Sequence, residues 1–217
     1  MVSLDSKNIP FGNSTNRLAN TGSVGGIFTK NGEVFVKKDE EGIKAIKFVK
    51  GALTLGNVSV PKTLAWNGSY TVATWVKNTK VGNEGECLAS WCDRHQFELA
   101  NSYNALFYNS GPYGAGAHLD GHFDMRYKKV PAENKWHYIV LTFDGVVEKI
   151  YVDGVLDNSQ NMILSSAIDE AKIIVGASDV GENYSGYMAS LRMYDYALTE
   201  QEITRLMSDT NPKTIKK

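Results

Sequence analysis

The sequence predicts an all-β protein, a two-sheet antiparallel β-sandwich with one short C-terminal helix, and three observations carry this prediction. Residues 136–156 read WHYIVLTFDGVVEKIYVDGVL, in which alternating apolar residues are interrupted at Asp144-Gly145, a dipeptide typical of a hairpin turn. Further short alternating segments follow along the chain with turn signals between them. The 217 residues also contain 20 glycines and only 5 prolines, which suits many strands joined by tight turns.

The predicted elements follow a polar arm at residues 1–26, which is expected to be irregular with one edge strand. The segment YTVATWV at 70–76 is apolar on both faces and predicts a central strand. Thr199 and Glu202 form a capping-box pattern that starts the helix, and residues 210–217 are predicted to be disordered. Other strands are predicted at 28–36, 43–49, 87–91, 97–99, 105–108, 116–119, 123–127, 136–143, 148–152, 171–175 and 187–194. No linker marks a second domain, so residues 1–217 are predicted as one domain.

Composition excludes several classes of function. Twenty-three Lys and Arg residues against 24 Asp and Glu give a net charge of -1, so there is no basic field for nucleic acid. No apolar run reaches the roughly 20 residues that a membrane-spanning helix needs, so no membrane insertion is expected.

Cys87 and Cys92 lie five residues apart in an extended segment, too far for a disulfide, and are predicted to be small buried thiols.

Several segments, in chain order, resemble a known family. They are NTGSVGGIF, GIKAIKFV, YTVATWV, the double Asp-Gly hairpin and SGYMASLRMYDYALTEQEI. Together they are similar to laminin-G-like, concanavalin A-like jelly-roll domains of bacterial polysaccharide-processing and cell-surface proteins. The resemblance implies a jelly roll, contact with a glycan or polysaccharide, an extracellular or cell-surface location, and further domains in a larger parent protein.

The central block at residues 84–127 holds the predicted sugar site. Sugar binding needs flat aromatic rings that stack on a pyranose and planar polar groups that pair with adjacent hydroxyls. The predicted ligand-binding residues are Trp91, Arg94, Tyr108, Tyr113, His118, Asp120, Asp124 and Arg126. In the subfamily that the block resembles, Arg94, Tyr113, His118 and Asp124 match motif positions. Leu119 stands where the family often has Trp.

These residues have structural alternatives. Trp91 in an alternating strand suits a core, and His118 with Asp124 suits a buried polar network. Hydrolases of the family use a pair of carboxylates on one strand face. The sequence has no such pair, which argues against a hydrolase. A lyase would have to recruit His118, Tyr127 and Arg94. Protein adhesion is a further alternative, although the mixed run KKDEEGIK at 37–44 is predicted to be a solvated loop.

No cofactor is required by this interpretation, and calcium is the remaining candidate. The resemblance implies a structural calcium site near the strand before the helix, but both typical acids are missing from Tyr187–Arg192. Asp179, Glu182 and Asn183 offer oxygen ligands nearby, and a polar surface turn explains them equally well. The sequence is therefore interpreted as a non-catalytic carbohydrate-binding module.

Overall fold

The computed structural model describes residues 1–12, 17–82, 85–92, 104–110, 115–118, 124–162, 164, 168, 171–179 and 181–214, with the backbone alone for residues 115–118. The elements are β1 (Val2–Asp5), η1 (Ser6–Asn8), β2 (Arg17–Ala19), β3 (Ile27–Lys38), β4 (Lys44–Gly56), η2 (Lys62–Leu64), β5 (Tyr70–Asn78), β6 (Gly85–Ser90), β7 (Ala105–Ser110), β8 (Ala115–His118), β9 (Met125–Arg126), β10 (Trp136–Phe143), β11 (Val147–Val152), β12 (Val155–Asn161), β13 (Ile174–Val175), β14 (Gly186–Tyr194) and α1 (Glu200–Asp209). The predicted all-β fold with one C-terminal helix is confirmed.

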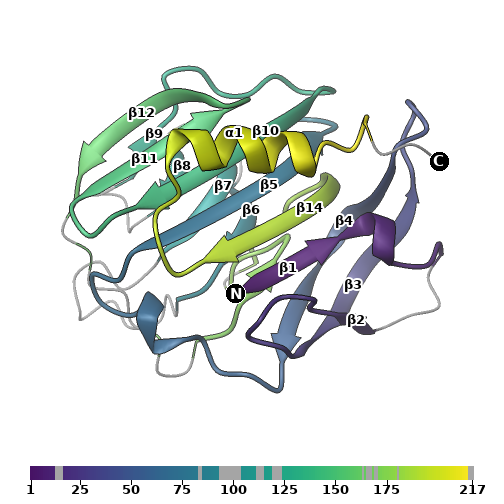
Figure 1. Cartoon of the computed structure of the whole chain (residues 1–217). Coiled ribbons are helices and arrows are strands. Elements are labelled where there is room, and N and C mark those ends of the chain that lie inside the picture. Colours follow the sequence, from purple (N-terminus) through teal and green to yellow (C-terminus); the bar gives the residue numbers. More distant parts are fainter. Residues whose placement is uncertain are drawn as a thin grey trace.

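The strands form one curled antiparallel sheet, whose halves pack as two layers (Figure 1). The first layer contains β12, β11, β10, β5, β14 and β1, and the second contains β13, β6, β7, β8 and β9. Strand β4 belongs to both layers, because its first part pairs with β14 and its last part with β13. The shared strand joins the layers into a sandwich.

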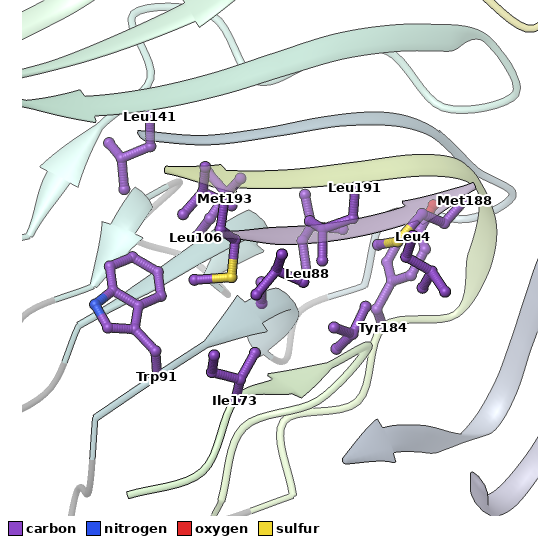
Figure 2. Packing of buried hydrophobic residues seen from close by; sticks show 14 of the residues in the cluster. Leu4, Leu88, Trp91, Leu106, Leu141, Ile173, Tyr184, Met188, Leu191 and Met193 are labelled. Carbon is purple, nitrogen blue, oxygen red and sulfur yellow. The ribbon is translucent and has the colours of Figure 1, made fainter. Parts of the chain in front are cut away.

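Alternation along the strands builds the core between the layers. In β10, Leu141 is buried in the same apolar cluster as Leu88 and Leu106 from the second layer (Figure 2). Trp91 lies at one end of this group and Tyr184 at the other. Because successive strand residues face opposite sides, the inward positions of β10 are apolar at every second residue, as the sequence predicts.

Helix α1 covers the outer face of the first layer (Figure 1). Tyr138 and Val140, the outward residues of β10, belong to a second apolar cluster with Ile203 of the helix. The predicted capping box is present: Glu202 N–H donates to Thr199 Oγ1, and Thr199 N–H donates to Glu202 Oε2 at 2.8 Å. The helix therefore begins where the sequence places it.

Both chain ends contain more regular structure than the sequence predicts. For residues 1–26 an irregular arm with one edge strand is predicted, and the described part contains two strands: β1, which pairs with β14 and buries Val2 and Leu4 in the core, and β2, which pairs with β3. The tail is ordered at its start: Thr210 is buried, and Lys213 Nζ lies 3.0 Å from Glu41 Oε2. Strand β12 was also absent from the prediction, since its sequence VLDNSQN is mostly polar.

The run KKDEEGIK is not simply a solvated loop. Asp39 in the β3–β4 turn is buried, and its Oδ2 accepts hydrogen bonds from Lys77 Nζ at 3.2 Å and from the Trp136 indole at 2.9 Å. Lys77 is itself buried in β5 and also contacts Glu40 and Glu41. This buried charge network ties the hairpin to the central strand.

The two cysteines fit their prediction. Cys87 and Cys92 are both buried, and no disulfide joins them. Cys87 packs with Ala105 and Phe107, whereas Cys92 belongs to the main core. The two thiols therefore lie in different apolar clusters.

Candidate functional site at the loop end of the sandwich

Several described residues of the predicted sugar-binding block at 84–127 lie at one end of the sandwich. We call it the loop end. In the first layer Tyr70 begins β5 and pairs with Phe143, the last residue of β10, which also pairs with Glu148. In the second layer Ser90 ends β6 and pairs with Ala105, the first residue of β7. Trp91 and Asn104, which lie near the two ends of residues 93–103 in the sequence, both contact Tyr70 at this end.

A buried polar cluster joins the two layers at the loop end. The Tyr70 hydroxyl lies 3.2 Å from Asn104 Oδ1 and also hydrogen-bonds Glu148 Oε1. The Tyr70 and Trp91 rings meet edge to face, with centroids 5.0 Å apart. All four side chains are fully buried. We call Tyr70, Trp91, Asn104 and Glu148 the polar cluster.

Three atoms of the polar cluster have no hydrogen-bond partner among the described residues. They are Trp91 Nε1, Asn104 Nδ2 and Glu148 Oε2. Buried polar atoms in folded proteins nearly always pair with protein groups or with ordered water. Two donors and a carboxyl oxygen in one small region therefore suit a bound water molecule or hydroxyl group.

Glu148 is an unusual acid within this cluster. Burial raises the pKa of its carboxyl to about 7, and the charge of Asp124 adds to this effect. The single Tyr70 hydroxyl proton lies between two acceptors, Asn104 Oδ1 and Glu148 Oε1. A protonated Glu148 resolves this conflict, because it can donate to the Tyr70 oxygen while Tyr70 donates to Asn104.

Two predicted stacking rings belong to the core instead. Trp91 is completely buried, and so is Tyr108, whose hydroxyl donates to the backbone oxygen of Ala132 at 2.8 Å. Neither ring presents a face to solvent, so the prediction that they stack on a sugar is wrong. Tyr108 occupies an inward position of β7, and Trp91, directly after β6, packs in the same core cluster. Tyr127, the hypothetical lyase acid, is also buried and donates to Phe107 O.

The structure describes only some of the remaining predicted ligand-binding residues. Asp124 is half-buried beside β9, and Arg126 is exposed on that strand. His118 ends β8, where its backbone pairs with Ala105 at the loop end. Arg94, Tyr113 and Asp120 lie outside the described residues, so their predicted roles stay predictions. The segment containing Tyr113 follows Ser110, which ends β7 away from the loop end.

The calcium candidates flank the start of β6. Glu182 O accepts a hydrogen bond from Cys87 N–H at 3.2 Å, and Asn183 forms an isolated bridge with Cys87. Asp179 precedes them in the same turn region. Within the described ranges, no group of three or more His, Cys, Asp or Glu side chains is placed to hold a metal. Calcium binding at these residues stays a prediction.

Sequence reasoning missed Trp66, which has the most exposed ring in the described part of the chain. Its side chain is 66% exposed, whereas Trp75, Trp91 and Trp136 are at most 8% exposed. Its backbone adopts φ = 55°, a left-handed conformation that bulky residues rarely take. The available signal was an aromatic residue directly before the turn dipeptide Asn67-Gly68. The polar cluster had a signal too, since Glu148 occupies an inward position of its strand.

The side chain of Asn67 fixes Trp66 at the loop end. Its Nδ2 donates to Gly145 O in the β10–β11 turn, and its Oδ1 accepts from Leu164 N–H at 3.1 Å. Three segments of chain are thereby joined beside the exposed indole. Val146, in the same β10–β11 turn, is also 61% exposed.

The arrangement around Trp66 suits binding of a flat, ring-shaped group. An exposed indole next to backbone anchored by Asn67 offers a flat apolar face on which a ring-shaped ligand can stack. The left-handed backbone at Trp66 costs on the order of 1–3 kcal/mol, and the exposed ring gains little free energy from burial. A contribution to fold stability therefore does not explain why a tryptophan occupies this position. Such strained backbone positions cluster at functional sites.

Comparison with known proteins agrees with this fold. A family model described as the concanavalin A-like lectin/glucanases superfamily matches residues 51–204. Domain 4 of AbnA, an extracellular GH43 arabinanase from Geobacillus stearothermophilus solved with arabinotriose, superposes with a TM-score of 0.69. The two chains share 19% identity over 94% of this chain and 96% of that domain. A search of curated proteins found no matching sequence.

Toxin binding domains share the architecture as well. The binding domain of botulinum neurotoxin serotype G has a TM-score of 0.61 and 15% identity, covering 96% of this chain and 50% of the toxin domain. The binding domain of botulinum neurotoxin DC, solved with rat synaptotagmin II, has a TM-score of 0.62 and 16% identity over 97% and 51%. This chain therefore spans about half of each toxin domain. At these identities the likeness concerns the fold.

Proposed function

The chain belongs to the concanavalin A-like lectin/glucanase superfamily, and on this basis we propose that it is a non-catalytic carbohydrate-binding module with its glycan site at the loop end. The observation that carries the proposal is the exposed, strained Trp66, held in place by Asn67. A pyranose or furanose ring stacks on this indole through its apolar face.

A structural neighbour supports the same proposal. The polar cluster lies between the layers behind this end, and because it is fully buried, its unpaired atoms suit an ordered water molecule and do not contact the sugar. The arabinotriose complex of the AbnA domain adds a precedent for sugar binding on this fold, in a domain of nearly the same length.

The proposal includes the setting of the module. We infer a larger extracellular or cell-surface parent protein, since the AbnA domain belongs to an extracellular arabinanase. In the described part of the chain, no helix combines the length and apolar character required to cross a bilayer. Protein binding is the competing function, because Trp66 and Val146 also provide an apolar anchor for a protein partner.

Replacing Trp66 by Ala tests the proposal. A glycan array identifies the best ligand, and calorimetry then compares the wild type with Trp66→Ala. We expect the variant to lose about 2 kcal/mol or more, roughly 30-fold in Kd, as is typical when an aromatic anchor is removed. Its melting temperature should stay near that of the wild type, because the ring is mostly exposed.

Val155→Ala is the matched control. Val155 is 69% exposed, and it follows the β11–β12 turn at the opposite end of β11. This variant should bind the glycan as the wild type does. If the array shows no glycan ligand while Trp66→Ala abolishes binding of a protein partner, the module is an adhesion domain and the proposal is wrong.

A further inference from the structure

A second candidate binding surface lies on the outer face of the first layer, near the C-terminal end of α1. It is a groove of about 880 Å³, within the range of small-molecule sites. Its walls come from η1, the β3–β4 turn and the segment after α1, and Ala189 of β14 contributes to its lining. The groove is formed toward the end of β14 that pairs with β4, away from the loop end.

Phe11 provides an aromatic wall of this groove. Its side chain is 53% exposed, and Lys44 Nζ lies 4.6 Å from the centre of its ring. The next residue, Gly12, fixes the chain to β3 through a backbone hydrogen bond to Val36 O at 2.9 Å. One face of the ring therefore meets an ammonium group, and the ring keeps a large exposed area beside it.

The charge of the groove is positive. Its lining contains Lys7, Lys38, Lys44 and Lys213 against Asp5 and Glu41, four positive charges and two negative ones.

Both carboxylates are already in ion pairs. Asp5 pairs with Lys7 and Arg192, each at 3.2 Å, and Glu41 pairs with Lys213 at 3.0 Å and with Lys77 at 3.1 Å. Among the described residues, no carboxylate lies within ion-pair distance of Lys38 or Lys44. Lys44 instead donates to Lys7 O at 3.3 Å.

We propose that this groove binds an acidic oligosaccharide whose sugar rings carry carboxylates. A sugar ring stacks on Phe11, and its carboxylate meets the ammonium groups of Lys38 and Lys44. The aromatic ring favours a sugar over a simple anion, and the uncompensated lysines favour an acidic sugar over a neutral one. The site is separate from the one at Trp66, so the inference does not depend on the proposed function.

Calorimetry with the full chain tests the proposal, using oligogalacturonate of defined length as the probe. Its methyl ester keeps the sugar rings but removes the charge, and should bind at least tenfold more weakly. Phe11→Ala and the double variant Lys38→Gln/Lys44→Gln should each weaken oligogalacturonate binding by tenfold or more. Binding should also weaken as salt is raised, because the lysines are solvent-accessible.

The pair Lys30→Gln/Phe35→Ala is the matched control. Lys30 Nζ lies 5.6 Å from the Phe35 ring, so the variant removes a similar lysine–aromatic pair outside the groove and should change the Kd less than twofold. Trp66→Ala should leave oligogalacturonate binding intact, whatever it does at the loop end. The inference is overturned if wild type does not bind oligogalacturonate, if the groove variants bind normally, or if polyglutamate competes equally well.

Discussion

Replacing Asp39 by Ala is expected to lower the free energy of unfolding by about 3–5 kcal/mol, the usual cost of breaking a buried ion pair. The side chain of Asp39 is fully buried and accepts from Lys77, from the Trp136 indole and from the backbone N–H groups of Glu41 and Ile43. The substitution leaves these donors without their acceptor. Urea unfolding followed by circular dichroism measures the loss.

The same charge network provides a control variant, and it predicts how the free energy of unfolding depends on pH. Burial acts to raise the pKa of Asp39, but hydrogen bonds from Ile43, Trp136 and Lys77 outweigh it and hold the pKa below its usual value. The stability from ionised Asp39 is therefore present at neutral pH and is lost as pH falls through the lowered pKa. Glu40→Gln, whose side chain is 69% exposed, should cost less than about 1 kcal/mol. An equal cost for both variants would contradict this account.

Glu148→Gln is expected to change the pH dependence of stability. The folded pKa of about 7 lies above the usual glutamate value of 4.5, so between these pH values the folded state holds a proton that the unfolded chain has released. Stability from this group therefore falls as pH rises across that window, by about 3 kcal/mol in total. Above pH 7 the buried carboxylate is charged in the folded state, and the full penalty applies.

Urea unfolding at pH 4.5 and at pH 8 separates the two proteins. Glutamine keeps an oxygen that can accept from Tyr70 but carries no titrating group. The variant should therefore be more stable than the wild type at pH 8, and the difference should shrink toward pH 4.5. A constant difference between the two proteins at both pH values would show that Glu148 does not titrate in this window.

The fold could be predicted where the sequence pattern is long. Residues 136–143 alternate over eight positions, and the strand at 70–76 is apolar on both faces, which fixes its central place between β10 and β14. Strand β1 could not be found in the same way, because four residues carry too little periodicity. Its partner β14 lies nearly the whole chain away.

The site was predicted less well, for physical reasons that differ between residues. Trp91 was assigned to sugar binding by residue type, but the facing layer covers its position. Trp66 lies in a turn, where no periodic pattern reveals exposure, and its left-handed backbone is visible only in the structure. The link between Asn104 and Glu148 through Tyr70 joins strands from both layers, and such contacts do not appear in local sequence.

Acrylamide quenching of tryptophan fluorescence tests the central claim, glycan binding at Trp66, most directly. The chain has four tryptophans, and Trp66 is the only one with a largely exposed ring, so quenching at low acrylamide reports on it. Saturation with the best glycan from the array should lower the quenching constant toward that of Trp66→Ala, because the sugar covers the indole. An unchanged quenching constant at full saturation would place the glycan elsewhere and contradict the account.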